Sequence, residues 1–490
     1  MQKKQTILVV ASLLVVVLSV TLAYFTAQII GKEKDVSVSS ADLKIIFTDT
    51  DGSISGTNIE PGWTTSKKFT VTNKSNETYK YNIVIQSLVN TFVTEGYLQY
   101  KIASTNGGYN MTEFKDVPKS STATDKVLAY SASIDVGVTQ TYTIEFIYRN
   151  DESVDQNVDQ NKELSGKLFI TAGTEDPSIY SKILRDNPKR ETRTNFSTVL
   201  TTDNTKTLYT ATEHDIPVYY FAGNALDNWV KLGGFYWRII RTNEDKSIRL
   251  LYHGTSTTST EAYIGTSEFN SSYKNSMYVG YKYGTSGSLE SNRTNENDST
   301  IKTYIDTWYQ NNLTDYTKYL SEYAVYCNDR KVSSGSYSAS GSTFSYAGDS
   351  RLNTNKTPTY DCTVATDAFS VNNTSAKLDY PIGLMTADEI SYAGGVYITD
   401  ALAWYYYNSE KGSSTGANFW WTMTPSMWNP YGGAIAFYVS DGSSDNNKGE
   451  LTNDIVSANN AIRPVISIKG DTLWKSGDGS PSNPYEIEMN

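Results

Sequence analysis

The sequence predicts an exported protein with two folded domains, an all-β sandwich followed by an α+β domain. Three observations indicate this. An apolar segment follows a short basic head at the N-terminus. Apolar side chains alternate with period two over residues 41–173, and helical and strand periods mix over residues 216–490. At 490 residues the chain is long enough for two or three domains.

Residues 1–31 are predicted to be a signal peptide or a membrane anchor. A basic head precedes an apolar run over residues 6–25, and about 20 apolar residues suffice to span a bilayer as a helix. Thr21 and Ala23 offer a small-residue cleavage site, so cleavage and retention in the membrane both stay open. We expect the rest of the chain to be extracellular, either anchored at the cell surface through this segment or released into a matrix.

Residues 41–173 are predicted to form an all-β sandwich, because apolar side chains recur at every second position. The first such strand carries Leu43, Ile45 and Phe47, and turn-rich stretches separate it from the later ones. The later alternating positions are Phe69, Val71, Tyr81, Ile83, Ile85, Tyr142, Ile144, Phe146, Tyr148, Leu168 and Ile170.

Residues 174–215 are predicted to hold a helix and a linker. Asp176 is placed to cap the helix and Pro177 to open it. The apolar face of this helix would carry Ile179, Tyr180, Ile183 and Leu184. Residues 186–215 are polar, which indicates a linker or a long surface loop.

Residues 216–490 are predicted to form an α+β domain. Strands are expected at 235–239, 248–252, 419–423, 435–439 and 462–468. One helix is expected over 301–308, a second from Thr314, and a third after a capping box of Thr386 and Glu389. Long Ser-, Gly- and Asn-rich loops, which we expect to be functional or disordered, span 331–350 and 440–460.

The composition excludes one class of partner. The net charge is −11, so the chain lacks the basic surface that phosphate neutralisation requires, and nucleic acid is not an expected partner. Only 19% of the residues are charged, while 38 are tyrosines. This is typical of polar, β-rich exterior proteins, because Tyr and Thr suit a half-buried pleated surface.

The chain has two cysteines, Cys327 and Cys362, and two histidines, His214 and His253. In an exported protein the cysteine pair most simply forms a disulfide, with two buried free thiols or a reactive thiol as alternatives. We expect both histidines to be structural or surface residues. The sequence contains no H-E-x-x-H, so we predict that the protein is not an enzyme.

The N-terminal region contains the segments LAYFTAQ, SSADLKIIF and NIEPGWTTSKKFTVTN in that order. A turn at Pro61 leads into a strand that carries Phe69, Val71 and Asn73. In this pattern residues 1–173 resemble the TasA/camelysin family of exported bacterial proteins. The resemblance implies a jelly-roll-like sandwich that serves in biofilm-matrix fibres or at the cell surface.

The C-terminal region contains the segments GGFYWRIIRTN, YPIGLMTADEISYAGG, NFWWTMTPS, IAFYVSDG and AIRPVISIKG. Trp420 and Trp421 precede variable loops, and Arg463 and Pro464 lie in the terminal strand. This order resembles a C-type-lectin-like module of the branch related to formylglycine-generating and sulfatase-modifying enzymes. Those enzymes use a C-terminal pair of cysteines, but both cysteines here lie upstream of the corresponding strands. The resemblance therefore implies a binding scaffold and not a catalyst.

A short aromatic segment before residue 435 is the candidate ligand surface. We expect Trp428, Asn429 and Tyr431 to bind a ligand, because aromatic faces stack on sugar rings or anchor protein interfaces while amides supply hydrogen bonds. If this segment is a strand, alternation places the side chains of Phe419, Trp421 and Met423 in the core. The side chain of Trp420 then lies on the opposite side of the strand.

The segment DGSSDNN, which begins at Asp441, is the candidate cation site. The carboxylates of Asp441 and Asp445 would bind calcium together with amide oxygens, and a hydrated hairpin turn is the alternative. We expect no other cofactor. The oxygen-bearing residues that follow Asp49 have the spacing of an EF-hand calcium loop, but the glycine that such a loop needs is missing from its position. We therefore attribute this spacing to chance. For Arg463 the resemblance to the C-type-lectin-like branch implies a structural role, in which its guanidinium binds loop carbonyls or a carboxylate.

Together these features predict a bacterial cell-surface or extracellular-matrix protein that mediates adhesion by binding a glycan or a surface protein through its C-terminal loops. Carbohydrate is the favoured ligand because of the Trp, Tyr and Asn side chains in the candidate loop. The alternative is a structural subunit that self-assembles into matrix fibres, with the N-terminal sandwich donating a strand between copies.

Overall fold

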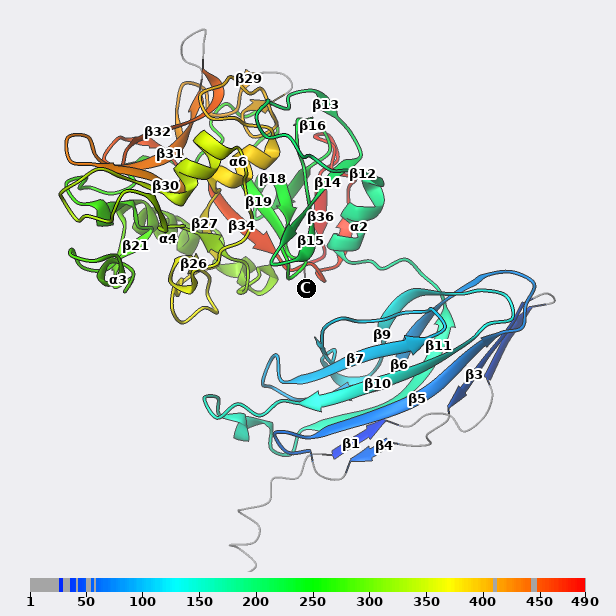
Figure 1. Cartoon of the computed structure of the whole chain (residues 1–490). Helices are drawn as coiled ribbons and strands as arrows, with labels where there is room; N and C mark the ends of the chain where they lie inside the picture. Colours follow the sequence, from blue (N-terminus) through cyan, green and yellow to red (C-terminus); the bar gives the residue numbers. More distant parts are fainter. Residues whose placement is uncertain are drawn as a thin grey trace, which may run out of the picture. The chain divides into compact units, whose positions relative to one another are not determined.

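The computed structural model describes residues 26–29, 36–40, 43–49, 54–56, 59–408, 412–441 and 447–489 (Figure 1). Of the predicted signal or anchor segment, residues 1–31, the structure describes only 26–29, which form a short strand, and the apolar run over residues 6–25 lies outside the described residues. Within those ranges, no helix is long and apolar enough to cross a membrane. The fold is mostly β-sheet. The chain divides into two compact units, unit 1 over Met1–Asp176 and unit 2 over Pro177–Asn490.

The described residues of unit 1 form two sheets. The first has the order β4-β1-β11-β6-β9 and contains β4 (Ile54–Gly56), β1 (Thr26–Ile29), β11 (Glu163–Ala172), β6 (Tyr79–Asn90) and β9 (Ser120–Ile134). The second has the order β2-β3-β5-β10-β7-β8 and contains β2 (Val36–Ser40), β3 (Leu43–Asp49), β5 (Thr64–Asn73), β10 (Thr139–Tyr148), β7 (Leu98–Thr105) and β8 (Lys115–Asp116). Figure 1 shows β5, β10 and β7 side by side.

One core joins the two sheets of unit 1. The predicted apolar positions from Phe47 to Ile170 that have described side chains are at most 1% exposed, and they form a single cluster. Phe69 stacks on Tyr142 across neighbouring strands, with ring centroids 4.9 Å apart. Alternation is strict in β10 but not in β6, where Asn82 and Val84 are buried as well. The period-two pattern therefore identified the core side chains of unit 1.

Unit 2 is built on two larger sheets. The ten-stranded sheet contains β12 (Lys189–Glu191), β14 (Thr207–Glu213), β15 (Ile216–Tyr220), β17 (Trp229–Leu232), β18 (Phe235–Thr242), β19 (Ile248–Gly254), β27 (Ile382–Leu384), β34 (Pro464–Ile468), β35 (Trp474–Ser476) and β36 (Tyr485–Ile487). The seven-stranded sheet contains β20 (Thr266–Ser267), β24 (Val332–Ser334), β25 (Phe344–Tyr346), β30 (Trp420–Asn429), β31 (Gly433–Asp441), β32 (Lys448–Ile455) and β33 (Asn460–Ala461).

Four two-stranded ribbons and several helices complete unit 2. The ribbons are β13 (Asp203–Asn204) with β16 (Asn224–Ala225), β21 (Lys282–Tyr283) with β22 (Asn297–Asp298), β23 (Tyr326–Cys327) with β26 (Ala368–Phe369), and β28 (Tyr407–Asn408) with β29 (Gly412–Ser413). The α-helices are α2 (Ile179–Asp186), α3 (Leu289–Asn292), α4 (Thr300–Asn312), α5 (Ala347–Asp349) and α6 (Ala387–Ala393).

Local signals located two helices of unit 2 correctly. The capping box of Thr386 and Glu389 is present at the start of α6, and the expected helix over 301–308 is α4. The helix expected from Thr314 is instead a short 3-10 helix, Thr314–Tyr319. Asp176 does not cap α2: the hydroxyl of Ser178 accepts the N–H of Ser181, so the helix begins later than predicted.

Two further expectations for unit 2 are corrected by the fold. Residues 186–215 are not a plain linker, since they contribute β12 and β14 to the ten-stranded sheet. Trp420 and Trp421 are both fully buried, although alternation predicted opposite environments. Strand β30 is covered on both faces, so both parities enter the core of unit 2.

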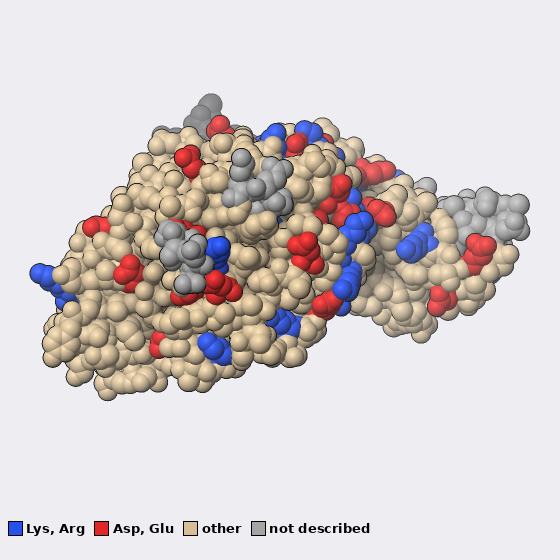
Figure 2. All heavy atoms as spheres, turned by 90° about the horizontal axis from the view of Figure 1, so that it is seen from above, with Lys and Arg blue, Asp and Glu red and all other residues tan. Residues whose placement is uncertain are grey.

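Charged side chains are sparse on the surface. Figure 2 shows one face of the molecule, where Lys, Arg, Asp and Glu are scattered and most of the surface is uncharged. This agrees with the charged fraction of 19%. Hydroxyl and amide groups therefore supply much of the polarity that faces solvent, and a ligand would meet hydrogen-bonding groups more often than fixed charges.

Candidate functional site

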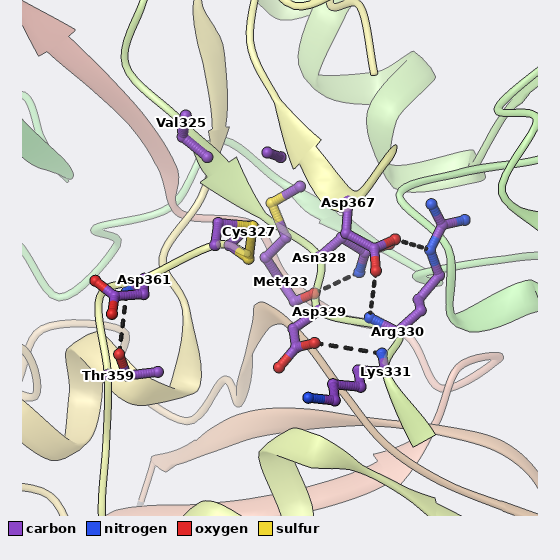
Figure 3. Close-up of a disulfide and its surroundings, with 12 residues drawn as sticks. Val325, Cys327, Asn328, Asp329, Arg330, Lys331, Thr359, Asp361, Asp367 and Met423 are labelled. Carbon is purple, nitrogen blue, oxygen red and sulfur yellow. Dashed lines mark hydrogen bonds and ion pairs between the residues drawn. A yellow bond between two sulfur atoms is a disulfide. The ribbon is translucent and has the colours of Figure 1, made fainter. Parts of the chain in front are cut away.

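The predicted disulfide is confirmed. Cys327 and Cys362 are bonded across a sequence separation of 35 residues, with Cα atoms 5.7 Å apart (Figure 3). Next to the bond, Arg330 and Asp367 form a fully buried ion pair, with 2.7 Å between Nε and Oδ1. The disulfide therefore fastens the loop between the two cysteines to a buried, charge-paired part of unit 2.

The residues predicted for the ligand surface do not come together on one surface. Trp428 is 2% exposed, because β25 and β31 flank it within the seven-stranded sheet, so its ring lies in the core and is not available to a ligand as predicted. Tyr431 is 97% exposed at the tip of the next turn. The Oδ1 atom of Asn429 accepts the backbone N–H of Tyr431 at 2.9 Å, so this amide stabilises the turn.

The candidate calcium segment is described only in part. Asp441, at the end of β31, is 2% exposed, and Asp445 lies outside the described residues. Calcium binding by this segment therefore stays a prediction.

A different acidic group in the described part of the chain has the spacing of a cation site. Asp298, Asp306 and Asp379 place one carboxylate oxygen each within 4.8 Å of the others. The ammonium of Lys302 lies among them, 3.2 Å from Asp298 and 2.9 Å from Asp379, and it also contacts Asp306. Burial alone would lower the pKa of Lys302, but the carboxylates, Asp306 foremost, raise it to about 12. The lysine is thus the built-in counterion of this cluster.

Arg463 and the two histidines make contacts that are typical of structural residues. Arg463 is fully buried and donates from Nε and Nη2 to the carbonyl of Tyr252, at 3.2 and 3.1 Å. His253 is fully buried with its ring edge-on to Trp229, at a centroid distance of 4.5 Å. His214 lies on a half-exposed turn, where its Nδ1 is 2.9 Å from Glu244. Nη1 of Arg463 also donates to the carbonyl of Tyr405, which lies in a turn, so Arg463 binds a loop carbonyl, as predicted, in addition to the strand carbonyl.

An open groove of about 650 Å³ runs along helix α4. The helix begins after Ser299, whose hydroxyl accepts the N–H of Lys302. Its inner face buries Ile301, Ile305 and Tyr309, so the opposite face is left to line the groove. The groove is therefore built on a regular helix whose other side is fixed in the core of unit 2.

Two aromatic side chains of α4 form the groove surface. Tyr304 is 39% exposed, and its hydroxyl donates to the carbonyl of Ile264 at 3.3 Å. Gly265 has a φ of +151°, and a Cβ at this position would collide with that hydroxyl. Trp308 is half-buried and packs against Phe235, with ring centroids 5.4 Å apart. Both rings are thus held in place from behind while they line the open side.

Hydroxyl and amide groups lie beside these rings. Thr303, Thr307 and Asn311 are exposed and follow one another at intervals of four along α4, so they form a second row parallel to Tyr304 and Trp308. The further lining residues are Asn270, Ser271, Tyr283, Asp298, Thr300 and Asn312. The groove therefore offers an aromatic row and a hydrogen-bonding row side by side.

One amide of the groove has an unused donor. Asn270 is 2% exposed, and its Nδ2 atom has no hydrogen-bond partner, although the residue lines the groove. The neighbouring backbone is fixed, because the N–H of Ser271 donates to Oγ1 of Thr300 at 3.0 Å. A buried amide without a partner costs free energy, and an acceptor on a bound ligand would satisfy it.

The groove carries little charge. Among its described lining residues only Asp298 is ionisable at neutral pH, since tyrosine is neutral there. Asp298 is paired with Lys282 and Lys302, each with an N–O distance of 3.2 Å. Both lysines are thus held at this carboxylate, so the lining has hydrogen-bonding groups but no cation directed at a ligand.

No protein-family model matches this chain, and a comparison with curated proteins finds no match. What the groove can bind therefore has to be judged from its own side chains. Pockets with aromatic walls and a few convergent polar groups are typical small-ligand and saccharide sites.

Sequence reasoning identified α4 but not its binding face. Tyr304 and Trp308 were assigned to a helix together with buried isoleucines, and their spacing of four residues places them on one side of it. The signal that could have revealed this face is the row of polar residues Thr303, Thr307 and Asn311, whose spacing of four residues indicates a side that faces solvent. Asn270 and Tyr283 come from separate segments, and only the tertiary fold brings them beside the helix.

Proposed function

We propose that the protein is a glycan-binding adhesion protein of the bacterial cell surface or extracellular matrix, and that the groove along α4 is its ligand site. The observation that carries this proposal is the pairing of an aromatic row, Tyr304 and Trp308, with a row of hydroxyl and amide groups. Sugar rings present apolar faces and hydroxyl edges, so they match both rows.

Two resemblances in the sequence support the same role. The TasA/camelysin-like pattern of residues 1–173 favours a place at the cell surface or in a biofilm matrix. The C-type-lectin-like pattern of residues 216–490 favours a binding scaffold. A protein ligand is the less favoured partner, because hot spots of protein interfaces are desolvated aromatic and apolar pockets, whereas this groove is open and rich in hydroxyl groups.

A glycan array probed with the full chain tests the proposal. We expect binding to at least one glycan and its loss in Tyr304→Ala and Trp308→Ala. Tyr431→Ala is the matched control, since this tyrosine is 97% exposed and does not line the groove. The absence of any glycan binding by the unaltered protein would refute the proposal. Loss of binding in Tyr431→Ala with retention in the two groove variants would move the site to the hairpin predicted from the sequence.

A structural role in fibres is a second candidate, favoured by one observation in unit 1. The four-residue strand β1 pairs in parallel with β11 and antiparallel with β4. A strand that pairs with its neighbour at only four positions is the kind of element that a neighbouring copy can supply by strand addition. We expect Gln28→Pro to abolish fibres seen by electron microscopy, because proline cannot donate to the ladder. Unaltered protein that stays monomeric at high concentration would argue against this role.

A further inference from the structure

We infer that the ligand of the α4 groove is an extended, uncharged oligosaccharide that lies parallel to the helix, with successive rings on Tyr304 and Trp308 and a hydrogen bond from the Asn270 amide. This inference rests on the proposed function and specifies the ligand class. Three properties of the groove support it: its direction, its unused donor and its charge.

The direction follows from helix geometry. Tyr304 and Trp308 are four residues apart, which separates them by about 6 Å along the axis. This is comparable to the repeat between successive rings of an extended oligosaccharide. The groove lining continues from Thr300 to Asn312, a distance of about 18 Å along the helix. A ligand of several units that follows the helix can therefore use both aromatic rings at once, whereas a monosaccharide can stack on only one of them.

The two rows of α4 divide the ligand contacts between them. The rings of Tyr304 and Trp308 offer faces for stacking, while the side chains of Thr303, Thr307 and Asn311 lie along the same line. The hydroxyls of Thr303 and Thr307 donate to helix carbonyls at 3.1 and 2.9 Å, so their oxygens are left as acceptors. Hydroxyl groups on a sugar edge are donors that match such acceptors.

The unused donor lies at the N-terminal end of this line. Nδ2 of Asn270 is buried in the groove wall without a partner, next to the start of α4. Because Nδ2 is a hydrogen-bond donor and not an acceptor, its partner on the ligand has to be an acceptor such as an oxygen atom. A hydroxyl, a ring oxygen or an N-acetyl carbonyl of a saccharide provides one.

The charge of the groove excludes acidic glycans. Asp298 lines it directly, and Asp306 and Asp379 lie close behind. Two lysines, Lys282 and Lys302, are paired with these three carboxylates, which leaves the cluster with a net negative charge. A uronate or sulfate group would meet this negative charge and find no cation among the described lining residues, so binding would be disfavoured.

Isothermal titration of the full chain with saccharides of matched length tests the inference. The neutral probes are cellohexaose and chitohexaose, and the anionic probes are hexagalacturonate and a hyaluronan hexasaccharide. We expect one neutral hexasaccharide to bind at least about tenfold more tightly than either anionic one and than its own monosaccharide, since the second stacked ring is worth on the order of tenfold in affinity. Equal or tighter binding of an anionic probe, or equal binding of the monosaccharide, overturns the inference while glycan binding itself stands. No binding of any glycan overturns both proposals.

Variants of the unused donor sharpen the test. Asn270→Ala should weaken binding of the neutral hexasaccharide by about fivefold or more, because it removes a donor that has no partner within the protein. Asn270→Asp should weaken binding further, since it replaces a donor with a negatively charged acceptor. Trp308→Phe should retain more affinity than Trp308→Ala, because phenylalanine still offers a ring on which a sugar can stack. Unchanged affinity in Asn270→Ala and Asn270→Asp would overturn the role of this amide.

Discussion

Glu389 bridges two buried arginines in unit 2. Its Oε1 atom lies 3.0 Å from Nε of Arg241 and 2.6 Å from Nε of Arg249, and all three side chains are at most 3% exposed. Burial opposes the charge on Arg241, but Glu213 and Glu389 together raise the pKa of its guanidinium above the usual range. Because a buried charge that loses its partner stays uncompensated, this carboxylate is a residue on which the core of unit 2 depends.

We predict that Glu389→Gln lowers the free energy of unfolding by about 3–5 kcal/mol, since Arg249 is left without its carboxylate partner. Urea denaturation followed by tryptophan fluorescence measures this. Glu486→Gln is the matched control: it breaks a pair with Lys475 whose side chains are 57% and 36% exposed, and it should change stability by less than about 1 kcal/mol. Equal stability of both variants would contradict the prediction.

His214 makes the protein weakly sensitive to pH. Partial burial disfavours the imidazolium, but the hydrogen bond and charge of Glu244, with smaller contributions from Asp361 and Glu213, outweigh it and raise the pKa of His214. The charged form is therefore favoured in the folded state. The contribution of His214 to the stability of the protein is thus fully present at pH values below the unfolded pKa of about 6.5. It is lost as the pH rises through the folded pKa.

The expected stabilisation is below about 1 kcal/mol, because the pair is more than a third exposed on the histidine side. An NMR titration of the His214 ring should show its pKa above the ordinary value, and Glu244→Gln should lower it. A pKa that does not change in Glu244→Gln would contradict the assignment of Glu244 as the main partner.

At the scale of secondary-structure elements, the disulfide holds together segments that regular structure connects only weakly. Cys327 is in β23, a two-residue strand paired with β26. Residues 331–350, expected as a loop, contain the short strands β24 and β25, the three-residue helix α5 and the first residue of a π-helix, Ser350–Asn355. With so little hydrogen-bonded structure, the covalent bond between Cys327 and Cys362 is the main restraint on this region's unfolded conformations.

Removal of this bond is predicted to lower the free energy of unfolding of unit 2 by about 3–4 kcal/mol, the value for a closed loop of this size. Denaturation with and without reductant measures the loss. The Cys327→Ser, Cys362→Ser double variant should be as stable as the reduced protein and should not respond to reductant. A reductant effect in the double variant would show that the loss has another origin.

Elements with a local signal were predicted well, and those that depend on distant partners were not. The cap of α6 is contained in Thr386 and Glu389, and the inner face of α4 follows from the spacing of Ile301 and Ile305, so both were predicted from neighbouring residues. Strand β14 was expected as linker, because its polar sequence becomes a strand only through pairing with β12 and β15. Pairing partners are set by the whole fold and not by the strand itself.

At the scale of the whole molecule, each unit has a hydrophobic core of its own. We therefore expect two calorimetric transitions, of which reductant lowers only one, that of unit 2. Phe69→Ala in unit 1 should lower only the other, since this ring is fully buried and its loss costs about 3–5 kcal/mol. A single transition, or a shift of both transitions in either experiment, would contradict the independence of the units.

The sequence by itself determined the β-rich character, the alternating core of unit 1 and the pairing of Cys327 with Cys362. These follow from local periodicity, from composition and from a cysteine count that allows a single pair. The tertiary structure alone decided that Trp428 is buried and that Asn270, Tyr283 and α4 form one groove. The physical reason is that burial and ligand geometry depend on which distant segments cover a side chain, and spacing along the chain does not contain that information.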